Sequence, residues 1–267
     1  MPTDEGIATK TIKITDKMTG KHSDVDVFIR NIWTYILDIC DEIPPIYEPQ
    51  LLLPILKKAE RILEKEETVL NLEGPLTIIG DVQGHGDSLL TLLSLTSQSS
   101  NQRFLFLGNY SGNGFASHES FFLLLALKVR FPQKIFLLRG NMEDSENAKE
   151  LIWGCFCVET DKSVPSKDNV PLFTEEDVET FCKRNCIDMI IRSRQLANEG
   201  VLNVPSHMIT IWSAVSFLDN FNNMAAALVL DSSSKKATIV SYGLYEPEPK
   251  SLDDTKPPGG RSTLAAV

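Results

Sequence analysis

Three short loops, each directly after a short apolar run, constrain the fold of this chain more than any other feature. The loops are residues 80–84 (GDVQG), 108–114 (GNYSGNG) and 139–143 (RGNME), and segments with helical periodicity separate them. This alternation of strand, loop and helix predicts a parallel sheet with helices on its faces. Because sites in such sheets form at the carboxyl ends of the strands, we expect the three loops to lie together at one edge of the sheet.

Apolar periodicity predicts the secondary structure around these loops. Apolar residues recur at helical spacing in some segments and form short continuous runs in others. Pro54 falls in the first turns of one predicted helix, where proline costs least, and Thr174 is expected to cap another. The predicted helices are 28–40, 49–66, 117–130 and about 174–185, with a further helix that begins with residues 89–95. The predicted strands are 76–79, 104–107, 135–138, 187–191, 208–212, 225–230 and 237–241, and the last two are expected to form a hairpin.

Length and charge limit the classes of partner. At 267 residues with 42% hydrophobic residues, the chain suits one large domain or one domain with a small appendage, and we place the domain at residues 26–245. Residues 1–25 are polar and 246–267 are rich in Pro, Gly and charge, so we expect a flexible arm and a disordered tail. The net charge of −10 disfavours binding to nucleic acid or to an anionic membrane, and no apolar run has the length of a membrane span.

The five cysteines indicate reduced thiols, because an odd number in a long chain does not suit a disulfide framework. The polar start of the chain is not that of a secretory signal, so we expect a cytoplasmic or nuclear location. Cys155 and Cys157 lie two apart, and Cys182 and Cys186 four apart. Neither spacing is that of a standard zinc motif, and no histidine accompanies them. Buried structural cysteines are the favoured interpretation.

The loops resemble those of the phosphoprotein phosphatases, the metal-dependent serine/threonine phosphatases, and are most similar to the type-one members. That family has GDxHG, GDxVDRG and GNHE, where this chain has GDVQG, GNYSGNG and GNMED. Residues 190–195 (IIRSRQ) resemble the family's RAHQ segment, and residues 212–217 (WSAVSF) resemble its FSAPNY segment. The resemblance extends over about residues 28–245. It implies an α/β, calcineurin-like metallophosphoesterase fold with mixed β-sheets flanked by helices.

One stretch of the family pattern is absent. The family has a long segment between GNHE and a later LLWSDP motif, and this segment carries a metal-binding histidine within an HGG sequence. Here residues 151–154 (LIWG), which resemble the later motif, follow Met142 almost at once, and the chain contains no HGG. We therefore expect the fold to be missing a central segment.

The resemblance implies a reaction in which a water bound to two divalent ions, manganese, iron or zinc, attacks a phosphate monoester. Two such ions ~3.5 Å apart repel each other by about 20 kcal/mol at an effective dielectric constant of 20, so anionic ligands are needed. Asp81 and Asn141 match metal-binding residues of the family. Gln83 and Arg194 replace histidines, and Asn109 replaces the bridging aspartate. With this donor set, we expect no bound ion or one weakly bound ion.

The residues for acid catalysis are replaced as well. Met142 stands where the family has the histidine that protonates the leaving oxygen, and Gly112 where it has the aspartate that orients this histidine. Asn113 replaces a phosphate-binding arginine, and Phe217 replaces a tyrosine of the late loop. By this comparison no catalytic or phosphate-binding residue is intact, and the chain is expected to have lost the standard mechanism.

Three functions remain compatible with the sequence. The favoured one is a pseudophosphatase that acts through protein–protein interactions with phosphatase regulatory or substrate proteins. The second is an active phosphatase whose metal site is rebuilt from Asp81 and Asn141 together with His85 and Asp87. The third is an incomplete product without function, because a truncated sheet would expose strand edges and apolar faces. Asp81 and Asn141 could equally serve only to cap loops and helix N-termini through backbone N–H groups.

Overall fold

The computed structural model describes residues 23–37, 49–97, 99–143, 155–156, 172–204, 207–219, 221–233 and 236–244. The predicted tail at 246–267, most of the predicted arm at 1–25, and the LIWG segment at 151–154 lie outside these residues. Helix α1 begins at Asp24, inside the predicted arm and four residues before the predicted start at 28. The cause is local: Ser23 Oγ accepts from the Asp26 amide at 3.3 Å and donates to its carboxylate at 2.7 Å, which caps the helix.

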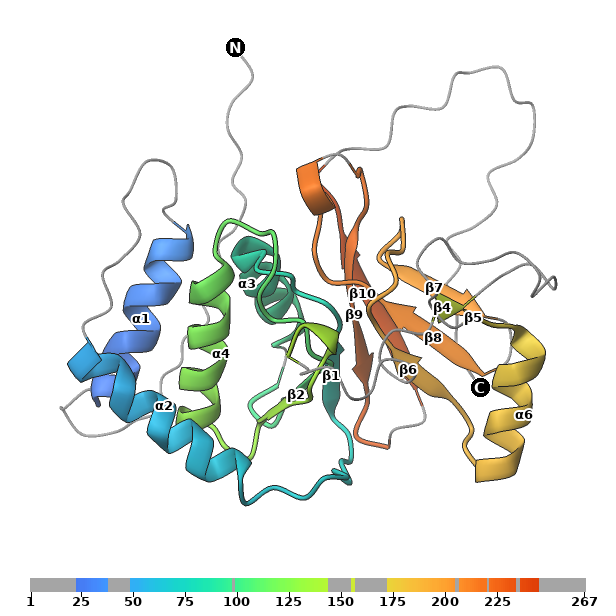
Figure 1. Cartoon of the computed structure of the whole chain (residues 1–267), viewed down its shortest axis with the longest axis horizontal. Coiled ribbons are helices and arrows are strands. Elements are labelled where there is room, and N and C mark those ends of the chain that lie inside the picture. The colour runs from blue at the N-terminus through green and yellow to red at the C-terminus, as the bar shows by residue number, and fades with distance from the viewer. Residues whose placement is uncertain are drawn as a thin grey trace, which may run out of the picture.

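A five-stranded sheet forms the centre of the molecule, with the strand order β10-β9-β1-β2-β3 (Figure 1). The first three strands along the chain are parallel, as predicted, and their last residues are in register: Ile79 pairs with Phe106, and Phe106 with Leu137. β9 runs antiparallel to β1 and forms the predicted hairpin with β10, so the sheet is mixed. The strands are β1 (Leu76–Ile79), β2 (Arg103–Phe106), β3 (Ile135–Leu137), β9 (Ala225–Leu230) and β10 (Ala237–Tyr242).

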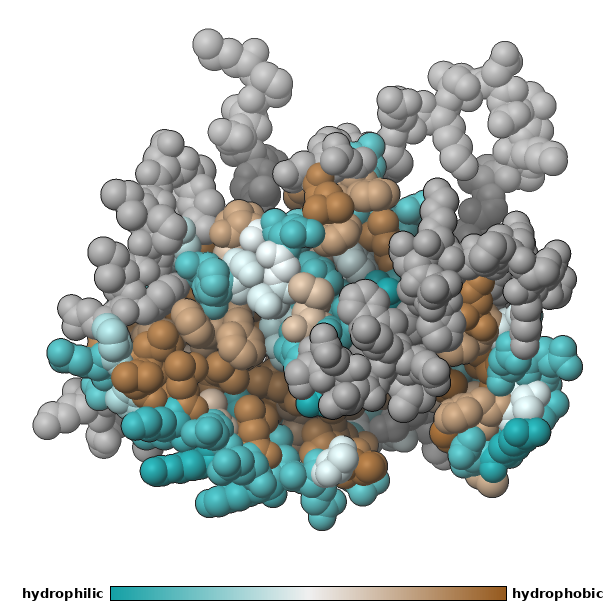
Figure 2. Space-filling view, in the orientation of Figure 1, coloured by the Kyte–Doolittle hydropathy of each residue, from teal (hydrophilic) through white to brown (hydrophobic). Residues whose placement is uncertain are grey.

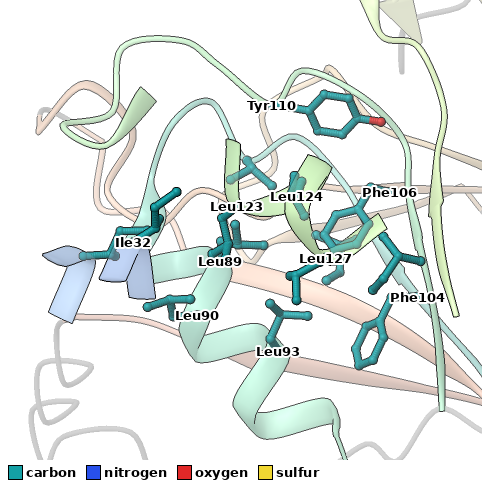
Figure 3. Close-up of a cluster of buried hydrophobic side chains, with 14 of the residues drawn as sticks. Ile32, Leu89, Leu90, Leu93, Phe104, Phe106, Tyr110, Leu123, Leu124 and Leu127 are labelled. Carbon is teal, nitrogen blue, oxygen red and sulfur yellow. The ribbon is translucent and has the colours of Figure 1, made fainter. Parts of the chain in front are cut away.

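Four helices cover one face of this sheet. In Figure 1, α1, α2 and α4 lie together on the left, and α3 lies between them and the strands. Most of their buried residues are leucine, isoleucine or phenylalanine, and Figure 3 shows Leu89, Leu123 and Leu124 packed near Phe106 in a continuous core. The helices are α1 (Asp24–Leu37), α2 (Pro49–Leu63), α3 (Gly86–Thr96) and α4 (Ser117–Arg130).

A three-stranded sheet, β6-β8-β7, packs on the other face. Its Ile209 and Ile211 contact Ile78 and Leu228 of the first sheet, and a parallel bridge between Asp81 and Trp212 joins the ends of β1 and β8. The end of β8 therefore lies at the same edge as the three loops. These strands are β6 (Ile190–Arg192), β7 (Val201–Val204) and β8 (Met208–Ile211), and a two-stranded pair, β4 (Cys155–Phe156) and β5 (Leu172–Phe173), precedes them.

Helix α6 (Glu175–Asn185) packs beside this second sheet and has the predicted cap. Thr174 and Asp177 form a capping box, and Cys182 is buried against Met208. The prediction that the cysteines are buried is wrong for Cys186, which is exposed at the left-handed C-terminal cap of α6. None of the described helices combines the length and apolar character that crossing a membrane requires.

Lys128 of α4 connects the helical layer to the sheet. Its side chain is fully buried, pairs with Glu66 and donates to the carbonyl oxygens of Pro132 and Ile135, the latter at 2.7 Å. Its ammonium group also lies 5.0 Å from the ring centroid of Phe136. A buried cation without its partners is costly, so this residue is expected to depend on all of these contacts.

We predict that Lys128→Met destabilises the protein by about 3 kcal/mol, because the Glu66 carboxylate and two carbonyl groups lose their donor. Urea unfolding of the variant and of Lys58→Met, an exposed lysine on α2, measures the difference. Equal stability of the two variants would contradict this account.

Candidate functional site

The loops after β1, β2 and β3 lie together, as the sequence predicts. The Gln83 amide donates to the carbonyl oxygen of Asn109 at 2.9 Å, and the Gly84 amide to that of Tyr110 at 3.0 Å. The Gly114 amide returns a bond to the carbonyl oxygen of Gln83 at 2.8 Å. These backbone bonds fix the first loop against the second independently of any side chain.

Glycine is required where the second and third loops approach each other. Gly108 has a φ of +112°, and a Cβ at this position would overlap the backbone nitrogen of Gly140. A Cβ at Gly140 would in turn overlap the Asn109 side chain. Both glycines are therefore needed for the loop geometry, whatever chemistry the site performs.

Glu143 holds the same two loops together through its carboxylate. Oε2 accepts from the amides of Asn109 at 2.8 Å and Gly140 at 2.9 Å, and Oε1 accepts from the amide of Tyr110 at 2.9 Å. Three backbone N–H groups are satisfied by one charged acceptor, which is a strong arrangement. The sequence did not predict this role. The sequence offers one indication of it. An acidic residue ends the RGNME loop, and loop residues beyond a strand end have backbone amides that form no strand-pairing bonds.

Asp81 lies at the end of β1 with only 2% of its surface exposed, and both of its carboxylate oxygens are hydrogen-bonded. Oδ2 accepts from Gln83 Nε2 at 3.0 Å and from Asn109 Nδ2 at 2.6 Å. Oδ1 accepts from the backbone amide of Arg194 at 2.9 Å, which positions the fourth segment of the site. Burial raises the pKa of Asp81, although the hydrogen bonds from Asn109 and Gln83 act to lower it.

Asn109 is the centre of the site. Its Nδ2 donates to Asp81 and also to Asn141 Oδ1 at 2.7 Å, and its Oδ1 accepts from the backbone amide of Met142 at 2.9 Å. The structure therefore brings four of the predicted metal positions together: Asp81, Gln83, Asn109 and Asn141. It orients them toward one another, with amide N–H groups between the two oxygens that match the family's metal ligands.

Arg194 also lies in the site, through its backbone. It has a φ of +76°, which turns its amide toward Asp81. Its neighbour Ser193 accepts from the Asp81 amide at 2.7 Å and donates to the carbonyl oxygen of Ile211 at 2.6 Å. Sequence reasoning did not identify Ser193. It braces Asp81 from the second sheet, which a single sequence cannot reveal because the two segments are distant along the chain.

None of the four positions that the sequence comparison links to acid catalysis, phosphate binding or the late loop carries an ionisable side chain. Met142 is 53% exposed, and the space beside Gly112 is filled by Gln83, whose Oε1 would overlap a Cβ there. Asn113 is exposed. Phe217 packs edge-on against Trp212, with ring centroids 4.9 Å apart. Met142, Asn113 and Phe217 cannot act as a general acid, and Gly112 has no side chain.

The two substitute ligands proposed from the sequence lie just after the first loop. His85 precedes α3 and its ring centroid is 6.2 Å from that of Phe217, while Asp87 is in the first turn of α3. Across the described parts of the chain, no three His, Cys, Asp or Glu residues are grouped so that they could hold a metal ion. With Asp81 already engaged by three donors, this set of residues does not fit a pair of divalent ions.

Comparisons with known proteins agree with this fold. The calcineurin-like phosphoesterase family matches residues 74–193. The chain is 26% identical over 264 residues to the serine/threonine-protein phosphatase 4 catalytic subunit of Eremothecium gossypii, covering 72% of this chain and 84% of that protein. It is also 26% identical over 260 residues to the corresponding subunit of Saccharomyces cerevisiae, covering 70% and 83%. Both are type-four phosphatases, so the type-one assignment stays a prediction.

A solved structure gives the same result for the fold. A protein serine/threonine phosphatase from Saccharomyces cerevisiae, described as similar to human phosphatase PP5, superposes with a TM-score of 0.62. The match covers 82% of this chain and 98% of that one at 16% sequence identity, which speaks to the fold alone. The calcineurin-like fold predicted from the three loops is confirmed.

We predict that Glu143→Gln destabilises the protein by on the order of 2 kcal/mol, because an amide nitrogen would face a backbone donor and the charge would be lost. Chemical unfolding, with Glu60→Gln on the exposed face of α2 as the matched control, measures the effect. A variant as stable as this control would show that the carboxylate does not hold the loops.

Proposed function

Because the chain is a phosphatase-like member of the phosphoprotein phosphatase family with a calcineurin-like phosphoesterase domain, we propose that it is a pseudophosphatase. In this proposal it retains the fold, does not hydrolyse phosphoesters and acts by binding other proteins. Proteins with this fold are generally divalent-metal-dependent phosphoesterases. The proposal therefore rests on the positions at which this chain's residues differ from the family's metal ligands and acid.

The observation that carries the proposal is the position of the Asn109 amide. It donates to Asp81 and Asn141 at 2.6 and 2.7 Å, and so the two remaining family ligands already share a donor. A cation bound by Asp81 and Asn141 would have to displace both of these hydrogen bonds. It would then face the Asn109 amide, which supplies no negative charge. Anionic ligands are what make two adjacent dications tolerable, and of the two side chains that accept from the Asn109 amide only Asp81 is a carboxylate.

The lack of a general acid at positions 112 and 142 also supports the proposed loss of activity, because the leaving oxygen must be protonated. Proton transfer to the leaving oxygen contributes typically 10²–10⁴-fold to such reactions, and Met142 and Gly112 cannot supply it. Restoring only one of these residues would not suffice. An aspartate at position 112 would have to displace Gln83, whose side chain and backbone both lie in the way.

The alternative is an active phosphatase with a metal site rebuilt from Asp81, Asn141, His85 and Asp87. The proximity of His85 and Asp87 to the first loop along the chain favours it. The engagement of both Asp81 oxygens, and the lack of a three-residue ligand cluster among the described residues, favour the pseudophosphatase. The continuous buried core and the two packed sheets support a folded protein rather than an incomplete product.

The partners we propose are phosphatase regulatory or substrate proteins. The relatives are named as catalytic subunits, that is, as components of assemblies. Around the site, Met142, Leu218 and Phe221 are exposed apolar side chains, and Figure 2 shows apolar surface at the top centre, where the short helix η2 (Phe217–Asp219) lies. Such a surface suits contact with protein better than with phosphate. We place the binding domain at 26–245 and the protein in the cytoplasm or nucleus.

A phosphatase assay with manganese tests the proposed loss of activity. We expect the purified full chain to hydrolyse a phosphoserine peptide no faster than Asp81→Asn does, because neither has a complete metal site. Manganese-dependent turnover that Asp81→Asn abolishes would overturn the proposal and favour the rebuilt site.

A binding experiment tests the proposed partners. Immobilised full chain is incubated with purified regulatory subunits of serine/threonine phosphatases. The Leu218→Asp/Phe221→Asp variant is compared with Leu51→Asp/Leu53→Asp, a somewhat more exposed pair on α2. We expect the first variant to reduce capture by about tenfold or more, since exposed apolar anchors dominate such interfaces. Equal capture by both variants would contradict a binding surface beside the site.

A further inference from the structure

The Asn109 side chain joins the segments that follow the first three strands of the sheet. It follows β2, its nitrogen bonds Asp81 after β1 and Asn141 after β3, and its oxygen accepts from the backbone of Met142. It is 2% exposed, so water does not compete for these bonds. All the polar atoms of its side chain are used.

The directions of these bonds decide what the network can accept. Asp81 and Asn141 both present oxygens to the centre, and oxygens that face a common point require a positively charged or proton-bearing group there. The Asn109 amide nitrogen is that group. A carboxylate at position 109 would instead place an anionic oxygen about 2.6 Å from Asp81 Oδ2, where two negative charges repel strongly in a buried environment.

We propose that the Asn109 amide holds the three loops together in place of a metal ion, so that the folded state does not depend on divalent cations. The same geometry implies that Asn109→Asp alone converts the network into a divalent-cation site. In this variant two carboxylates and the Asn141 amide oxygen would face one point, a ligand set that manganese or magnesium accepts. This inference concerns how the fold is stabilised, and it does not depend on whether the protein turns over substrate or binds partners.

Thermal unfolding of the full-length chain in EDTA and in manganese chloride tests both parts. The wild type is expected to melt at the same temperature in the two conditions and to retain no manganese after gel filtration. In EDTA, Asn109→Asp is expected to melt about 5 °C lower or more, because two buried hydrogen bonds are replaced by charge repulsion. Manganese is expected to restore most of this loss.

Asn113→Asp is the matched control. It makes the same chemical change in the same loop, but its side chain is exposed, so it should melt like the wild type and gain nothing from manganese. If Asn109→Asp melts like this control in EDTA, the network does not hold the loops. If manganese fails to stabilise Asn109→Asp, the proposed conversion to a cation site is wrong.

A double variant covers the case in which Asn109→Asp does not fold. Asp81→Asn/Asn109→Asp retains one carboxylate and one amide at the two positions and removes the charge repulsion. It is expected to melt above Asn109→Asp alone and to gain less from manganese. A double variant that is no more stable than the single one would contradict the proposed repulsion, and stoichiometric manganese bound to the wild type would overturn the proposal as a whole.

Discussion

A buried carboxylate at the end of the central strand sets the requirement that the rest of the site meets. Asp81 is almost fully buried, and a charge in such a position is stable only with opposite charge or several hydrogen-bond donors. Here the donors are the side chains of Gln83 and Asn109 and the backbone of Arg194. Each comes from a different part of the loop cluster, so satisfying one charge also fixes the relative positions of these segments.

The need of the Asp81 carboxylate for hydrogen-bond donors explains why Gln83, Asn109 and Gly112 occur together at the site. Gln83 reaches Asp81 because the space beside Gly112 has no side chain, and a side chain at Gly112 would need that same space. Asn109 can bond both Asp81 and Asn141 because it carries two N–H groups and no charge. An aspartate at position 109 would place a second carboxylate in contact with Asp81. The observed set avoids that conflict and keeps the loop geometry.

Much of the fold could be predicted from the sequence. The short apolar run Ile135–Leu137 predicts a strand, and the periodicity of Ser117–Arg130 predicts a helix. Glycines directly after the strands indicate where the loops of the site begin. The sequence does not predict the strand Val201–Val204, because it is short and its pairing with β8 is a tertiary interaction. The start of α1 was placed too late because the capping residue, Ser23, lies in an otherwise polar segment.

The site could be predicted in composition but not in arrangement. The loops identify Asp81, Asn109 and Asn141, whereas the direction of each amide depends on the distances between three loops that only the fold determines. Diffraction from a crystal grown with manganese, with anomalous scattering to locate the ion, tests the central claim most directly. We expect the Asn109 amide to contact both Asp81 and Asn141, with no ordered manganese between them. Two manganese ions at the ends of β1, β2 and β3, with the Asn109 oxygen turned toward them, would contradict it.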